Sequence, residues 1–176
     1  MVRGLPEHPS SYLSLPILFS PTGKNRNTAV NRLITLDSLE ATNVLANIIL
    51  RKCSFGSLVL LTGPMGVGKT TLVQHLAVQL DSKARVTSPT YTLIHEYPTS
   101  SGVLTHIDAY QLPGSESLMR LGLDDYLEKS RLVVVEWGED LRKLYPEAIH
   151  VDLTFQKGIR IAQFSIKKPT HRRASK

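Results

Sequence analysis

The sequence predicts an α/β fold in three layers, with a mostly parallel central sheet and an antiparallel C-terminal hairpin at its edge. From residue 34 onward, short apolar runs of strand length alternate with segments of helical periodicity. In RLVVV, residues 131–135, the four residues after Arg131 are continuously apolar, as expected of a central parallel strand covered on both faces. Two alternating runs near the end flank Lys157 and Gly158, which are typical of a tight turn between paired strands.

The first half of this region predicts a helix, a strand and a second helix. In residues 34–52, ITLDSLEATNVLANIILRK, apolar residues recur at helical spacing, and Asp37 or Ser38 can cap the start. Residues 57–63, SLVLLTG, predict a buried strand that enters a glycine loop. Residues 69–80, KTTLVQHLAVQL, predict a helix with leucines along one face.

The second half is richer in predicted strands. Apolar runs of strand length are separated there by segments with turn or helical signals. The elements are, in chain order, a loop passing into a strand (85–98), a strand (102–110), two short helices broken at Gly122 (115–129), a strand (131–137) and the closing hairpin (148–166).

Charge and composition divide the chain into a domain at residues 33–166 and two basic tails. Residues 1–32 are rich in Pro and Ser, contain four basic residues against one acid, and predict a poorly ordered extension. Residues 167–176 contain five basic residues and no acid, although the net charge of the whole chain is only +6. We interpret the tails as solvated ends; contact with RNA or an acidic partner is the alternative.

The composition is that of an ordinary globular protein, with 41% hydrophobic and 20% charged residues. No apolar run approaches the roughly 20 residues that a membrane helix needs, so we expect no membrane association. The single cysteine, Cys53, excludes an intramolecular disulfide, and its place at the end of an apolar helix predicts an inert thiol. We expect a cytoplasmic protein, with organellar import through residues 1–32 as the alternative.

A phosphate-binding loop is the strongest signal in the sequence. GPMGVGKTTL satisfies G-x-x-x-x-G-K-[ST] and stands between a predicted strand and a predicted helix, as the motif requires. Its backbone N–H groups and the helix N-terminus attract phosphates, Lys69 reaches the terminal phosphates, and the Thr70 hydroxyl is suited to Mg²⁺. The sequence therefore predicts a fold like that of P-loop NTPases, with ATP and Mg²⁺ as cofactors. The nucleotide-binding residues in the loop are Gly63, Pro64, Met65, Gly66, Val67, Gly68, Lys69, Thr70 and Thr71.

Two carboxylates follow predicted strands and are candidates for a second contact to the metal. Glu136 ends the more continuously apolar run, where burial would be costly without a partner, so we assign it to Mg²⁺, directly or through water. Asp108 ends the other strand and is suited to orienting the attacking water. Together with Lys69, these are the predicted catalytic residues.

Three nearby features carry weaker signals. His106 lies two residues before Asp108 on the same strand face, which favours a hydrogen-bonded core histidine over a ligand. His95 and Glu96 do not begin an H-E-x-x-H motif, because Thr99 stands where the second histidine belongs, so no zinc site is predicted. The hydroxyls of TSPTY, residues 87–91, predict either a loop that a γ-phosphate orders or a plain capped loop.

Five blocks together resemble one family. GPMGVGKTTL, SPTYTL, HIDAYQL, LGLDDYL and VVVEWGE, in this order and at these intervals, are similar to TsaE, also called YjeE. That family comprises bacterial ATPases of tRNA threonylcarbamoyladenosine (t6A) synthesis. The resemblance runs from about residue 34 to residue 164, so only the two tails lie outside it.

The resemblance implies slow ATP hydrolysis by a protein that works with TsaB and TsaD and meets tRNA through their complex. TsaD is the transferase of that complex, and TsaE is not. By the family pattern, Thr70 and Glu136 hold Mg²⁺, TSPTY is a switch loop, and Asp108 lies near the nucleotide. Further residues implied at the nucleotide are Thr87, Ser88, Thr90 and Trp137, with Asp37 and Arg160 at less distinctive positions.

One position departs from the family pattern. The block HIDAYQL has Gln111 where the family commonly has Arg, and glutamine supplies neither the charge nor the bidentate fork of a guanidinium. Arg120 is the nearest possible substitute in sequence.

Two alternatives to partner-stimulated hydrolysis remain: a nucleotide-dependent clamp that needs no hydrolysis, and a small-molecule kinase. Against the kinase, residues 113–131 are short for a lid and contain only Arg120 and Arg131.

Overall fold

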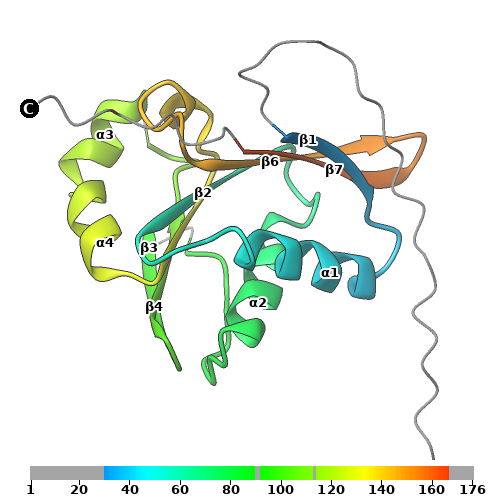
Figure 1. Cartoon of the computed structure of the whole chain (residues 1–176). Helices are drawn as coiled ribbons and strands as arrows, with labels where there is room; N and C mark the ends of the chain where they lie inside the picture. Colours follow the sequence, from blue (N-terminus) through cyan, green and yellow to red (C-terminus); the bar gives the residue numbers. More distant parts are fainter. Residues whose placement is uncertain (1–29, 90–91, 113, 167–176) are drawn as a thin grey trace, which may run out of the picture.

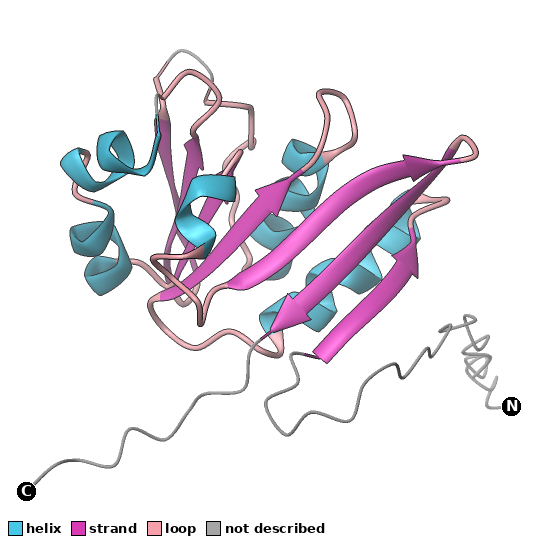
Figure 2. Cartoon of the chain, turned by 90° about the horizontal axis from the view of Figure 1, so that it is seen from above, coloured by secondary structure: helices cyan, strands magenta, loops and turns pink. Residues whose placement is uncertain are grey.

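The computed structural model describes residues 30–89, 92–112 and 114–166. In these residues one seven-stranded sheet has the strand order β1-β7-β6-β2-β5-β4-β3, and Figure 2 shows helices on both of its faces. The strands are β1 (Val30–Thr35), β2 (Ser57–Thr62), β3 (Ile94–Thr99), β4 (Gly102–Asp108), β5 (Leu132–Glu136), β6 (Ile149–Gln156) and β7 (Ile159–Ile166). The helices are α1 (Leu39–Leu50), α2 (Lys69–Gln79), α3 (Gly114–Arg120), α4 (Leu123–Lys129) and the 3₁₀ helix η1 (Glu139–Arg142).

The predicted α/β fold in three layers is confirmed. The middle strands β6, β2, β5 and β4 run parallel to one another, and the closing hairpin pairs β6 with β7 antiparallel. On one face, α1 and α2 pack on the sheet through a cluster that includes Leu45, Leu72 and Val134. On the other face, α3, α4 and η1 pack through a cluster that includes Leu123 and Val135. Figure 1 shows these two helical layers on either side of the sheet.

The edges of the sheet differ from the prediction. The hairpin is not outermost, because β1 pairs antiparallel with β7 along its whole length. Residues 30–32, which we assigned to the N-terminal extension, therefore begin a strand. At the other edge, β3 is also antiparallel to its neighbour β4. Residues 1–29 and 167–176 of the predicted tails lie outside the described residues.

The remaining element predictions hold. Of the two candidate caps for the first helix, Ser38 is the one used, since its Oγ accepts a hydrogen bond from Ala41 N at 3.0 Å. The two short helices α3 and α4 are separated at Gly122, as expected. In the described part of the chain, no helix is long and apolar enough to span a membrane.

Register places the two candidate carboxylates side by side. In the parallel pair β4–β5, Asp108 is opposite Glu136, and both end their strands. Side chains two residues apart lie on the same face of a strand, so Glu136 shares the face of Val134, which packs toward α1 and α2. Both carboxylates therefore lie near the N-terminal end of α2.

Cys53 lies away from this end of the sheet, and burial raises the pKa of its thiol to about 11. Because the thiolate is the reactive form, we expect iodoacetamide at pH 8 to alkylate folded Cys53 at least about tenfold more slowly than the same residue in urea. The chain has one cysteine, so the mass of a single adduct measures the rate. Equal rates in the folded and unfolded protein would contradict this prediction.

Candidate phosphate-binding site

The glycine loop joins the end of β2 to the first residue of α2. The strand is buried from Leu58 to Thr62, and the helix begins at Lys69, directly after Gly68. Beyond the loop lies a pocket of about 380 Å³. The residues that line it are Met65, Gly66, Gly68, Lys69, Thr70, Thr71, Ser88, Asp108, Tyr110, Glu136 and Trp137. The structure therefore gathers most of the predicted site residues around one cavity.

A larger pocket, of about 530 Å³, lies at the opposite end of the sheet, where β2 and β6 begin. Its lining includes Ser57, Leu127 and Ile149 but none of the predicted site residues. Ligands of open parallel sheets bind at the carboxyl ends of the strands, which favours the smaller pocket as the functional one.

The Lys69 ammonium group lies against the loop. Its Nζ donates hydrogen bonds to the carbonyl oxygens of Gly63 at 2.7 Å and Pro64 at 3.0 Å, and it stands 3.6 Å from the centre of the Trp137 ring. Burial lowers the pKa of Lys69, and the nearby Glu136, Glu139 and Asp108 carboxylates oppose that shift. A cation that is poorly solvated and held by neutral carbonyls is well suited to bind phosphate oxygens.

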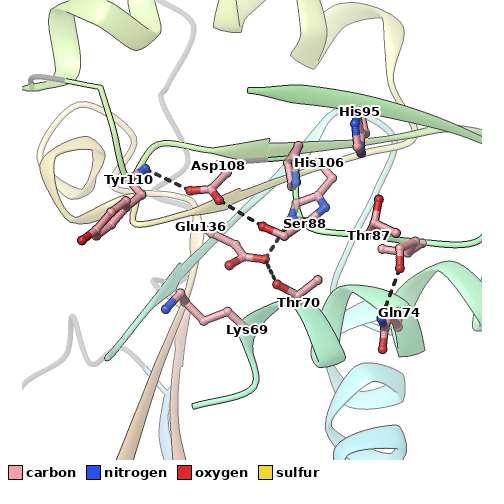
Figure 3. Close-up of polar contacts among 12 residues, drawn as sticks. Lys69, Thr70, Gln74, Thr87, Ser88, His95, His106, Asp108, Tyr110 and Glu136 are labelled. Carbon is pink, nitrogen blue, oxygen red and sulfur yellow. Dashed lines mark hydrogen bonds and ion pairs between the residues drawn. The ribbon is translucent and has the colours of Figure 1, made fainter. Parts of the chain in front are cut away.

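Thr70 and Glu136 meet at the bottom of the pocket. The Thr70 Oγ1 donates to Glu136 Oε1 at 2.8 Å, and the Glu136 side chain is almost fully buried (Figure 3). Within the described residues, no group of three or more His, Cys, Asp or Glu side chains could hold a metal ion by itself. One hydroxyl and one carboxylate form a hard oxygen pair, which fits a Mg²⁺ ion that also takes waters and substrate phosphates.

Asp108 connects the pocket to the loop that precedes β3. Its Oδ1 accepts from the backbone N–H of Tyr110 at 3.0 Å, and its Oδ2 accepts from Ser88 Oγ at 3.2 Å (Figure 3). The loop is also held at Thr87, whose N–H donates to the Tyr97 hydroxyl and whose carbonyl accepts from it. Of the predicted switch hydroxyls that the structure describes, Ser88 lines the pocket. Thr87 does not, and Thr90 lies outside the described residues.

Trp137 lines the pocket because the strand stops before it. A continuing strand would turn its ring to the face opposite Glu136, but β5 ends at Glu136 and Trp137 has φ +61°. Its ring lies beside Lys69 and packs on Tyr110 with ring centres 4.9 Å apart. A bulky residue with positive φ is unusual, and such strain is concentrated at functional sites.

The residues with weaker predicted roles differ in how close they lie to the pocket. Arg160 comes close to the loop, since a Cβ on Gly68 would lie 3.2 Å from its Nη1. Asp37 is not among the residues that line the pocket, so its proposed nucleotide contact stays a prediction. Gln111 is exposed, and Arg120 is paired with Glu116 on the surface of α3 and does not line the pocket. Neither supplies the guanidinium that the family pattern places after the tyrosine.

Sequence reasoning missed two aspects of the site. Tyr110 was not singled out, although it follows Asp108 at a strand end and adds an aromatic wall to the pocket. His106 was expected to be a hydrogen-bonded core residue, which is confirmed, but its partner was not foreseen. That partner is Glu136, whose Oε1 lies 2.9 Å from His106 Nε2.

A glycine loop between a buried strand and a helix, with a lysine and a hydroxyl facing a strand-end carboxylate, defines the class of P-loop-like α/β proteins. A family model described as threonylcarbamoyl adenosine biosynthesis protein TsaE matches residues 36–163. This chain therefore belongs to the TsaE family, whose proteins take part in t6A biosynthesis.

Curated relatives agree with this assignment, and a solved structure has the same fold. The Nostoc sp. protein named tRNA threonylcarbamoyladenosine biosynthesis protein TsaE is 36% identical over 75% of this chain and 84% of its own length. The protein of that name from Mycobacterium bovis is 34% identical over 70% and 77%. The one from Haemophilus influenzae is 36% identical over 52% of this chain and 58% of its own length. YdiB from Bacillus subtilis has the same fold, with a TM-score of 0.65 and 22% identity over 80% of this chain and 88% of YdiB.

Proposed function

We propose that this protein binds ATP with Mg²⁺ at the glycine loop and hydrolyses it slowly, as the ATPase component of cytoplasmic t6A synthesis. It acts with TsaB and TsaD, meets tRNA through their complex, and is not itself the transferase. The observation that carries the proposal is the 2.8 Å contact between Thr70 Oγ1 and Glu136 Oε1, with Lys69 held in the same pocket. The match to the TsaE family supports the pathway.

Each side chain of the pocket has a distinct task in this proposal. Thr70 and Glu136 hold Mg²⁺, which when bound neutralises negative charge on the phosphates. Lys69 exchanges its two loop carbonyls for oxygens of the terminal phosphates. Asp108, whose carboxylate is nearly buried, accepts a hydrogen bond from the attacking water and orients it. Ser88 brings the loop before β3 to the same pocket through its hydrogen bond to Asp108.

The test is a reconstitution that measures ATP turnover and t6A formation with and without TsaB, TsaD and tRNA. We expect weak turnover alone and a clear rise with the partners. Glu136→Gln, which keeps the shape but removes the charge, should lower stimulated turnover about 100-fold, a loss typical of one stabilising group in an active site. Glu128→Gln changes an exposed carboxylate on α4 and is the matched control. Unchanged turnover in Glu136→Gln would show that the metal assignment is wrong.

A nucleotide-dependent clamp is the second candidate function. It is favoured by the Ser88–Asp108 hydrogen bond, because this contact couples the loop to the pocket without any chemistry. If Glu136→Gln failed to hydrolyse ATP yet supported repeated rounds of tRNA modification, the clamp would replace the ATPase proposal. The kinase alternative has no comparable support. Arg120 pairs with Glu116 on the surface, and Arg131 donates to the carbonyls of Ser54 and Cys53, away from the pocket.

A further inference from the structure

A fully buried histidine lies behind the candidate metal ligand. His106 is 0% exposed, and its Nε2 lies 2.9 Å from Glu136 Oε1. We propose that His106 is a positioning residue that fixes the orientation of the Glu136 carboxylate for Mg²⁺. The inference rests on the proposed function and adds a residue to it that the family resemblance did not assign to the site.

The pairing of β4 with β5 brings His106 and Glu136 into contact. His106 is opposite Val134 in the parallel pair β4–β5, and Glu136 is the next residue of β5 on the same face. Both side chains therefore project toward α2, where Thr70 approaches from the other side of the carboxylate. Figure 3 shows Glu136 between His106 and Thr70. The geometry comes from strand register, so it does not depend on a flexible loop.

The direction of the hydrogen bond follows from the chemistry of its partners. An ionised carboxylate only accepts, so His106 Nε2 carries the proton and donates it. Within the described residues, both hydrogen bonds to this carboxylate, from His106 Nε2 and from Thr70 Oγ1, end on Oε1. In Figure 3 the second oxygen is turned toward the side of the site on which Lys69 lies. Two donors on one oxygen fix the rotation of the carboxylate and leave the second oxygen directed into the pocket.

The other ring nitrogen indicates that packing alone does not explain this histidine. In the described part of the structure, His106 Nδ1 is buried and has no hydrogen-bond partner. A buried nitrogen without a partner costs stability, and an apolar side chain of similar size would fill the same space without that cost. The polar benefit of the imidazole is therefore the single bond to Glu136. Histidines and carboxylates that orient metal ligands in this way commonly control metal affinity.

Two substitutions separate positioning from packing. His106→Leu keeps most of the volume and removes the donor, whereas His106→Gln keeps an amide donor near the position of Nε2. The probe is the non-hydrolysable analogue AMPPNP, titrated with MgCl₂ or EDTA. The readout is the fluorescence of Trp137, the single tryptophan of the chain, whose ring lines the pocket.

We expect His106→Leu to bind AMPPNP in EDTA like the wild type, but to need about tenfold more Mg²⁺ for the half-maximal fluorescence change. His106→Gln should restore most of the Mg²⁺ response. In turnover assays, His106→Leu should lower kcat at fixed Mg²⁺ while the KM for ATP stays close to the wild-type value. Thermal unfolding of both variants in the absence of nucleotide shows whether they remain folded.

The outcomes are distinguishable. If the wild type responds to Mg²⁺ and His106→Leu has the same midpoint, His106 only fills space and this inference is overturned. The same holds if His106→Gln is as defective as His106→Leu while both are folded. If AMPPNP binding to the wild type does not depend on Mg²⁺ at all, the proposed function itself fails, and the inference fails with it.

Discussion

Replacing Lys69 with methionine is expected to lower partner-stimulated ATP turnover by at least about 100-fold without destabilising the protein. Methionine keeps the length and apolar character of the side chain but has no ammonium group to bind phosphate. The lysine is only 5% exposed, and burial lowers its pKa, so the charge is held in the fold at a cost. Within the described residues, no carboxylate forms a salt bridge with Lys69, so its loss leaves no buried partner charge unpaired, and an apolar chain removes the cost of desolvating the ammonium group. Lys69→Met should therefore lose ATP turnover without losing stability.

The measurement pairs ATP turnover with the thermal unfolding temperature of the nucleotide-free protein. Lys83→Met, at an exposed lysine between α2 and β3, is the matched control and should leave turnover unchanged. Wild-type turnover in Lys69→Met would contradict the assignment of this pocket to phosphate binding. A large drop in unfolding temperature would instead show that the two carbonyl contacts of Lys69 hold the loop together.

The parts of the site that sequence predicted depend on local patterns. The spacing of the glycine loop determines where Lys69 and Thr70 stand on α2. The run RLVVV places Glu136 at the end of a buried strand, and parallel strands bring their carboxyl ends to one edge of the sheet. The contact between Thr70 and Glu136 follows from these two facts, and the structure shows it.

Strand β1 could not be predicted in the same way. Its sequence, VNRLIT, has polar residues at its second and third positions, and in the structure the side chains from Asn31 to Thr35 are exposed or half-buried. No apolar alternation therefore marks it as a strand. This segment is held as a strand by backbone pairing with β7, a partner more than a hundred residues away in the chain.

The face of the sheet toward which the Trp137 side chain points depends on where β5 ends. A period of two applies only while the strand continues, and the positive φ of Trp137 breaks it. Positive φ is rare for tryptophan, so no sequence rule would place it there. The two contacts that hold Thr87 and Ser88 also depend on residues distant in sequence, because Tyr97 reaches Thr87 from β3 and Asp108 reaches Ser88 from β4.

The second large effect is expected at Gly63, where alanine should lower the free energy of unfolding by about 3 kcal/mol or more. Gly63 has φ +128°, and a Cβ there would lie 2.1 Å from the carbonyl oxygen of Leu153. That carbonyl belongs to β6, which pairs with β2 directly before the loop, so it cannot move aside without opening the sheet. The absence of a side chain at Gly63 thus allows the glycine loop to pass close to β6.

Gly66→Ala is the matched control in the same loop. Its φ is +75°, but a Cβ there meets nothing within 4 Å, so only the backbone cost of about 1–2 kcal/mol applies. Urea unfolding followed by circular dichroism in the absence of nucleotide measures both variants. A loss in Gly63→Ala no larger than in Gly66→Ala would contradict the predicted clash with the Leu153 carbonyl. The larger loss is expected in Gly63→Ala, because the backbone cost at φ +128° adds to the clash of a side chain with β6, which leaves no room there.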